Sequence, residues 1–213
     1  MKIIKPSFEI LTPIDEASIY KQIESIARTC YKSEDKITDE SAPKMVKGLL
    51  KRNHLAMIEH AHVSVKFICD RGVSHEIVRH RIASYAQEST RYCNYSQGKF
   101  GNEITVIKPL FFDEGTPEYI IWEESCMQAE KAYNELIEMG RSPQEARSVL
   151  PNSLKTEIVV TMNLREWIHF FNLRALGTTG APHPQMKEIA MMVLEEFSNQ
   201  IPEIFGDMYF DAV

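Results

Sequence analysis

The chain has 213 residues, of which 44% are hydrophobic and 25% charged, and its formal net charge is −6. This length suits one domain or a compact two-lobed one and can bury a core without disulfide or metal staples. The negative charge argues against a general affinity for nucleic acid or anionic membranes. The four cysteines contain no CxxC pair, and the first residues lack the apolar stretch of a signal peptide. We therefore expect a cytoplasmic protein without nucleic-acid or membrane partners.

The first half of the chain alternates between helical and extended patterns. Apolar residues at helical spacing predict helices over residues 15–31 and about 41–52. Alternating apolar residues predict a half-buried strand over residues 63–69. Gly72 is expected to end that strand, and Ser74 is expected to cap a short helix after it.

The second half predicts further helices and two more strands. Strands are expected over residues 103–109 and 158–162, and a helix that Thr116 caps is expected to run to Gly140. The sequence 142–145 reads as a capping box, and Asn163 is expected to cap a helix that carries Trp167. A last helix is predicted over residues 185–199. Because strands and helices follow one another without regular alternation, the fold class is α+β.

The segment 79–92 concentrates three arginines, Arg79, Arg81 and Arg91, in an acidic protein. Guanidinium is a planar fork of donors that matches phosphate and keeps its charge. Gln87 can both donate and accept, which suits the amide edge of a pyrimidine. On an extended segment Ser89 and Arg91 would point to the same side. A solvated charged loop is the alternative interpretation.

A second polar cluster lies towards the C-terminus. Its members are Arg147, Asn163, Arg165, His169, Asn172 and Arg174. Three of them, Arg165, His169 and Asn172, follow i, i+4, i+7 spacing and would form one helical stripe. The wet face of an amphipathic helix has the same pattern, and Arg174 could satisfy carbonyl groups at the helix end.

The histidines do not predict a metal site. His54, His60 and His62 lie close together, but the sequence places no third ligand beside them. His75 and His80 are five residues apart, whereas two histidines on one helix face need i, i+4. The chain also lacks a P-loop, a GxSxG motif and a GxGxxG motif. Cys93 could be a nucleophile, but no base is paired with it, and most unpaired cysteines are packing residues.

The segment 79–92 resembles the signature of the flavin-dependent thymidylate synthases, which is Arg-His-Arg, seven residues, Ser, one residue and Arg. The residues Arg79-His80-Arg81, Ser89 and Arg91 match every defined position. The resemblance extends over about residues 28–185.

The resemblance implies a single domain over residues 1–213, with a twisted, mostly antiparallel sheet flanked by helices. It implies a homotetramer whose active sites form where subunits meet. FAD would be bound by His54, Arg79, His80, Arg81, Asn163, Arg165 and His183. The substrate dUMP would be bound by Glu76, Gln87, Ser89, Arg91, Arg147 and Arg174.

The implied activity is that of an FAD-dependent methyltransferase that converts dUMP to dTMP. Its one-carbon donor would be 5,10-methylenetetrahydrofolate, and NADPH would supply reducing equivalents through FAD. Arg174 is the expected catalytic residue, because a fixed cation can stabilise negative charge on the uracil ring. Ala86 and His169 stand where some relatives have asparagine.

Three other functions are compatible with parts of the sequence. A related flavoenzyme could act on tRNA uracil, although the acidic charge and the lack of a basic surface speak against RNA. A non-catalytic nucleotide-binding protein could use the arginines structurally. A metal-dependent hydrolase would need ligands that the sequence does not place.

Overall fold

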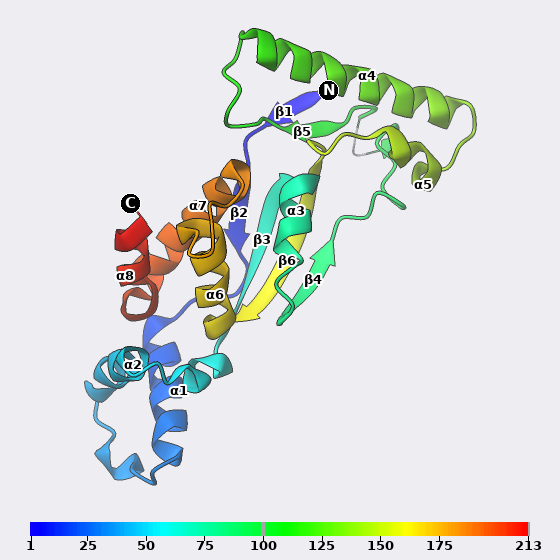
Figure 1. The fold of residues 1–213 in the computed structure, drawn as a ribbon. Helices are drawn as coiled ribbons and strands as arrows, with labels where there is room; N and C mark the ends of the chain where they lie inside the picture. Colours follow the sequence, from blue (N-terminus) through cyan, green and yellow to red (C-terminus); the bar gives the residue numbers. More distant parts are fainter. Residues whose placement is uncertain (99–100, 213) are drawn as a thin grey trace. The chain divides into compact units, whose positions relative to one another are not determined.

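A computed structural model describes residues 1–98 and 101–212 of the chain (Figure 1). Its strands are β1 Lys2–Ile4, β2 Ser7–Ile10, β3 His62–Asp70, β4 Ala83–Gln87, β5 Thr105–Ile107 and β6 Lys155–Asn163. Its α-helices are α1 Glu16–Thr29, α2 Ser41–Lys51, α3 Arg71–Ile77, α4 Pro117–Glu138, α5 Pro143–Ala146, α6 Leu164–Phe171, α7 Pro184–Gln200 and α8 Pro202–Ala212. Shorter helical turns are η1 Glu34–Lys36, η2 Leu55–His60, η4 Arg147–Val149 and the π-helical turn η5 Asn172–Leu176. Across these described residues no helix has the length and apolar character needed to cross a membrane.

The strands form a four-stranded sheet in the order β2-β3-β6-β4 and a two-stranded parallel sheet of β1 and β5. Strands β3 and β6 run antiparallel, because Ser64 faces Thr161 (Oγ to Oγ1, 2.8 Å) while the N–H of Arg71 donates to the carbonyl of Leu154 at 3.1 Å. Every second residue of each strand is buried, as the alternating pattern predicted. The mixed, mostly antiparallel architecture confirms the α+β prediction.

The described chain divides into two compact units. Unit 1 comprises Met1–Phe8, Lys66–Arg79 and Tyr85–Val159, and unit 2 comprises Glu9–Val65, His80–Ser84 and Val160–Val213. The division falls within the strands of the larger sheet, so neither unit is continuous in sequence. A single-domain organisation stays a prediction.

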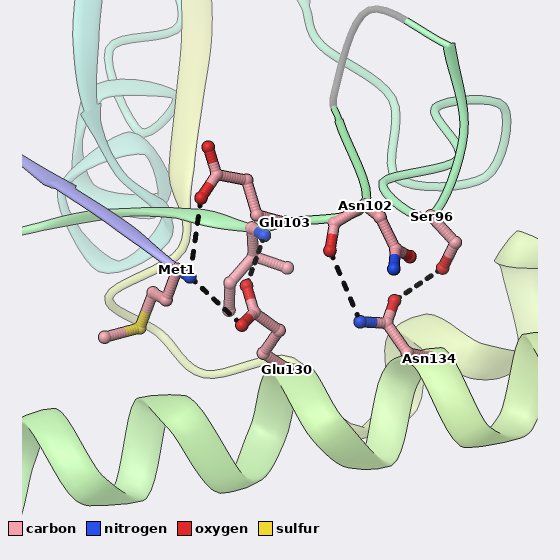
Figure 2. A network of polar contacts seen from close by, with 7 residues as sticks. Met1, Ser96, Asn102, Glu103, Glu130 and Asn134 are labelled. Atoms are coloured by element: carbon pink, nitrogen blue, oxygen red, sulfur yellow. Dashed lines mark hydrogen bonds and ion pairs between the residues drawn. The ribbon is translucent and has the colours of Figure 1, made fainter.

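Unit 1 has its own core on the inner face of α4. Buried side chains there are Tyr95, Ile104, Val106, Cys126, Tyr133, Ala146 and Leu154. Above this core, Glu130 of α4 accepts from the N-terminal ammonium of Met1 at 3.1 Å and from the backbone N–H of Ile104 at 2.7 Å (Figure 2). One turn along, Asn134 accepts from Ser96 Oγ at 2.6 Å and donates to the carbonyl of Asn102. These bonds attach the first strand and the loop before β5 to α4.

Unit 2 is built around the aromatic face of α6. Trp167, Phe170 and Phe171 are fully buried and contact one another. Trp167 and Phe171 pack against Phe197 of α7, and Phe171 also packs against Phe205 of α8. The indole N–H of Trp167 donates to the carbonyl of Val63 on β3 at 3.1 Å, which fixes α6 against the sheet.

Local sequence signals placed most helix ends correctly. Thr116 and Asn163 cap α4 and α6 as predicted, and the predicted capping box opens α5. Helix α1 starts at Glu16, close to the predicted start, with Asp15 as its cap. Gly140, with a positive φ of 85°, follows the end of α4 as expected.

Three local predictions were wrong. Asp70, not Ser74, caps α3 by accepting from the N–H of Val73 at 2.8 Å, so Gly72 lies inside that helix. The helix over residues 185–199 is not the last one, because a further helix, α8, begins at Pro202, a residue that suits the first helical position. Ser89 and Arg91 lie in a turn after β4, where the N–H groups of Tyr92 and Cys93 donate to the carbonyl of Ser89.

We expect Trp167→Ala to lower the free energy of unfolding by about 3–5 kcal/mol, because it empties a buried aromatic site and leaves the Val63 carbonyl without its donor. Urea denaturation at fixed protein concentration would measure this change. Asn199→Ala, at an exposed position of α7, is the control and should change stability by less than about 0.5 kcal/mol. Equal stability of the two variants would contradict this account of the core.

Candidate functional site

The predicted binding residues separate between the two units. Five predicted dUMP residues lie in unit 1, namely Glu76, Gln87, Ser89, Arg91 and Arg147. Unit 2 contains Arg174 and the predicted FAD residues His54, His80, Arg81, Asn163, Arg165 and His183. Arg79, the last residue of a unit 1 segment, is the exception among the FAD set. The predicted site residues therefore form two clusters, one in each unit.

In unit 1 the turn after β4 gathers three predicted dUMP residues. The guanidinium of Arg147 on η4 donates to Thr90 Oγ1 at 3.1 Å, which attaches it to the residue between Ser89 and Arg91. The hydroxyl of Ser89 accepts from the backbone N–H of Arg91 at 3.3 Å. Arg91 and Arg147 are both exposed, whereas Thr90 is buried. The turn thus presents two guanidinium groups from a fixed backbone, a geometry suited to a phosphate.

Gln87, the last residue of β4, and Glu76, on α3, are the other two predicted dUMP residues of unit 1. Gln87 donates from its amide to Ser74 Oγ at 2.9 Å and to Thr156 Oγ1 at 3.3 Å. Because both amide hydrogens are used inside the unit, only its carbonyl oxygen can face a ligand. Glu76 is half-buried on α3.

A pocket of about 460 Å³ lies beside Gln87 and is lined by a charged cluster. Lys155 contacts Glu88 at 2.8 Å and Glu157 at 2.7 Å, and the hydroxyl of Tyr95 donates to Glu88 at 3.0 Å. Although burial lowers it, the pKa of Lys155 is raised overall by hydrogen bonds and charge from Glu157 and Glu88. Cys93 also lines this pocket, and its role as a nucleophile stays a hypothesis.

In unit 2 the buried His80 connects the signature motif to Arg174. Arg174 Nε donates to His80 Nε2 at 3.1 Å, and His80 Nδ1 lies 3.5 Å from Glu166 Oε1. Burial, and then the charges of Arg174 and His169, lower the pKa of His80 to about 4. The imidazole is therefore neutral at neutral pH. A contact with carbonyl groups at the helix end was the alternative interpretation of Arg174, which thus has a hydrogen bond to a residue of the signature motif.

His80, Glu166 and His169 together form a group of potential metal ligands, with one ligand atom of each within 4.8 Å of the others. This group differs from the histidines that the sequence brought together, because its members come from α6 and from the segment before β4. It combines two buried side chains with the exposed His169.

His54 and Arg165 lie on one pocket of about 390 Å³. Its lining combines these side chains with Cys30, Tyr31 and apolar residues of α1, α2 and η2. Arg165 also pairs with Glu59, Nη1 to Oε1, at 2.5 Å. A cation and an aromatic side chain on an apolar floor suit part of a dinucleotide cofactor, so the residues present are compatible with FAD.

Two other predicted FAD residues are helix caps. Asn163 accepts from the N–H of Glu166 at 2.8 Å, and His183 Nδ1 accepts from the N–H of Gln185 at 3.3 Å. Those atoms are therefore committed to α6 and α7. Arg79 and Arg81 are exposed on either side of the buried His80.

Sequence reasoning missed Glu166 and Thr90 as members of these clusters. Glu166 was interpreted as part of the cap of α6, yet its side chain is buried and directed at His80. A glutamate flanked by buried apolar residues, Leu164 and Trp167, was the available signal. Nothing in the sequence distinguishes Thr90 from the other hydroxyl residues of its segment.

Comparisons with known proteins agree with the resemblance. A family model described as thymidylate synthase complementing protein matches residues 14–203. The chain is 33% identical over 167 residues to a flavin-dependent thymidylate synthase of Pyrococcus furiosus, covering 78% of this chain and 66% of that protein. It is 30% identical over 203 residues to one of Geobacter sulfurreducens, covering 92% of this chain and 83% of that protein.

A solved structure shares the fold over the whole length. The crystal structure of the UMP/dUMP methylase PolB from Streptomyces cacaoi, bound with 5-Br dUMP, matches with a TM-score of 0.79. The match covers 100% of this chain and 98% of that chain at 18% identity, so the likeness concerns the fold. Together, the family model and the similarity to named relatives place the chain in the family of flavin-dependent thymidylate synthases, as the signature motif predicted.

Proposed function

We propose that this chain converts dUMP to dTMP, with 5,10-methylenetetrahydrofolate as carbon donor and NADPH as reductant. Membership of the family supports the reaction, since its members are FAD-dependent methyltransferases. The observation that carries the assignment to residues is the hydrogen bond from Arg174 to the buried His80 of the signature. We further propose a cytoplasmic homotetramer whose subunits share active sites.

Arg91 and Arg147 bind the phosphate of dUMP in this proposal. Both side chains are exposed; the guanidinium of Arg147 bonds to Thr90, and the backbone N–H of Arg91 bonds to the Ser89 hydroxyl in the same turn. Phosphate oxygens accept charge-assisted hydrogen bonds that are about twice as strong as neutral ones. The remaining unit 1 residues, Glu76 and the carbonyl of Gln87, contact the nucleoside.

Arg174 acts on the uracil ring. Negative charge develops on the ring carbonyls when C5 becomes nucleophilic or when C6 accepts hydride. A pre-oriented cation stabilises that charge, and one such donor is worth about 3–4 kcal/mol. The bond to His80 fixes the guanidinium before substrate arrives, so little reorganisation is needed during the reaction.

Unit 2 holds the cofactor in this proposal. Arg165 and His54 on their shared pocket, with the exposed Arg81, provide the positive and polar groups that the dinucleotide requires. The side chains of Asn163 and His183 contribute indirectly, because their capping bonds orient the starts of α6 and α7. FAD, once bound and reduced by NADPH, would supply the hydride that completes the methyl group.

Arg174→Ala should abolish dTMP formation while the protein still purifies with FAD. The assay mixes protein, dUMP, methylenetetrahydrofolate and NADPH under low oxygen and measures dTMP by chromatography. Because the PolB neighbour is a UMP/dUMP methylase, a parallel reaction with UMP tests the choice of sugar. Arg141→Ala, at an exposed arginine that pairs with Glu145, is the matched control and should retain wild-type turnover. Nearly unchanged turnover of Arg174→Ala would contradict its role, and a wild-type protein without flavin would contradict the function.

Arg91→Ala and Arg147→Ala should each weaken dUMP binding by about 10- to 100-fold, because each removes a charge-assisted bond worth about 1.5–3 kcal/mol. Thr90→Val keeps the volume but removes the acceptor that orients Arg147, so a smaller loss is expected. Isothermal titration of dUMP into the FAD-loaded protein measures these affinities. Equal affinity in wild type and both arginine variants would exclude this turn as the phosphate site.

A further inference from the structure

The side chains of Glu166, His80 and Arg174 form a chain of contacts in unit 2. Glu166 Oε1 lies 3.5 Å from His80 Nδ1, and His80 Nε2 accepts from Arg174 Nε at 3.1 Å. Glu166 and His80 are buried, and Arg174 is half-buried. These contacts therefore connect the buried Glu166 side chain to the partly exposed guanidinium of Arg174.

The chemistry of arginine decides the protonation of His80. A guanidinium group has donors only, so the nitrogen it contacts must offer a lone pair. His80 Nε2 is thus unprotonated, and the proton of the neutral ring lies on Nδ1, which faces the Glu166 carboxyl group. A protonated imidazole would set an N–H of His80 against the N–H of Arg174. The low pKa of His80, about 4, agrees with the neutral form.

The proton on His80 Nδ1 disfavours the binding of a metal ion by His80, Glu166 and His169. Glu166 and His169 are three residues apart on α6, a spacing that di-metal helical bundles use for their ligands. A metal at His80 Nδ1 would have to displace the proton and move it to Nε2, where the Arg174 donor stands. The positive guanidinium would also repel the ion. The hydrogen bond from Arg174 and the 3.5 Å contact with Glu166 therefore favour a neutral, metal-free His80 over coordination.

The backbone around Arg174 has an unusual conformation. Arg174 lies in the π-helical turn η5, a rare conformation that occurs frequently at functional sites. Gly177 ends this turn in the left-handed region with φ of 70°, and an added Cβ there would lie 3.0 Å from the Gly180 carbonyl oxygen and from Pro182. The turn after Arg174 thus requires glycine.

We propose that Glu166 is a positioning residue, which holds the Nδ1–H of His80 and thereby keeps Nε2 as the acceptor that orients the Arg174 guanidinium. The bond through Nε fixes the plane of that group and so the direction of the edge formed by its two terminal nitrogens. This inference rests on the proposed function, in which Arg174 acts on the uracil ring. Glu166 itself touches neither substrate nor cofactor in this scheme.

The protonation of His80 tests the proposed role of Glu166 without any turnover. Nitrogen-15 labelling of the seven histidines and long-range ¹H–¹⁵N spectra distinguish the two neutral forms of each ring. The His80 signals are those that His80→Gln removes. We expect the Nδ1–H form in the wild-type protein at neutral pH and a shift towards Nε2–H in Glu166→Leu. An Nε2–H form or an imidazolium in the wild type would overturn the proposal.

Steady-state kinetics tests whether the contacts of Glu166 and His80 affect the reaction through Arg174. Glu166→Leu removes the acceptor while keeping the volume, and it should lower kcat about 10²-fold, since a small misplacement of a catalytic group has an effect of this size. FAD content and melting temperature should stay close to wild type. Glu166→Gln retains an acceptor oxygen and should restore kcat to within a few-fold of wild type. The control is Glu124→Leu at an exposed position of α4, which should leave kcat unchanged.

The outcomes separate this inference from the function on which it rests. Unchanged kcat in Glu166→Leu, or an equal loss in Glu166→Gln, would overturn the positioning role. If Glu166→Leu does not fold, the wild-type spectrum and the Glu166→Gln kinetics decide the question. A wild-type protein that makes no dTMP would refute the proposed function, and the spectra alone would then decide whether the Glu166 contact sets the form of His80.

Discussion

A guanidinium group can be held in one orientation inside a protein only by an acceptor that stays neutral or negative. Unit 2 meets this constraint with His80, whose burial keeps the ring neutral and whose Nε2 accepts from Arg174. A carboxylate in the same place would neutralise the positive charge that acts on a substrate. A neutral imidazole orients the arginine and leaves its charge intact. The proposed chemistry of the cluster depends on this difference.

Helix α6 links this interaction to the stability of unit 2. One side of the helix packs Trp167 and Phe171 into the aromatic core, while Glu166 is directed at His80. At its start Asn163 provides the cap, and at its end the chain continues into the π-helical turn that carries Arg174. Because the core fixes the position of α6, it also fixes the position of the turn that carries Arg174. Residues that the family resemblance assigns to ligands thus also have structural roles, and Asn163 is the clearest example.

The sequence predicted features that depend on neighbouring residues and missed those that depend on distant ones. The caps at Thr116 and Asn163 follow from side chains three residues from the groups they bind. By contrast, the contact between His80 and Arg174 joins residues 94 positions apart, and no local pattern contains it. The family resemblance named both residues, but only His80 belongs to the signature motif. Gln87 shows the same limit, since its donors are taken by Ser74 and by the distant Thr156.

The chain is acidic overall, yet two of its arginines are oriented by neutral acceptors. An exposed guanidinium gains little from a single surface carboxylate, because water screens the pair and ordering the side chains costs entropy. Arg147 instead bonds to the hydroxyl of Thr90, a neutral acceptor that orients it without reducing its charge. In unit 2 the neutral His80 accepts from Arg174 and likewise orients it without reducing its charge. Both arginines thus keep full positive charge in a fixed direction within a chain that is negative overall. Such cations bind an anion more strongly than mobile ones, because the entropy of ordering them is lost on folding and not on binding.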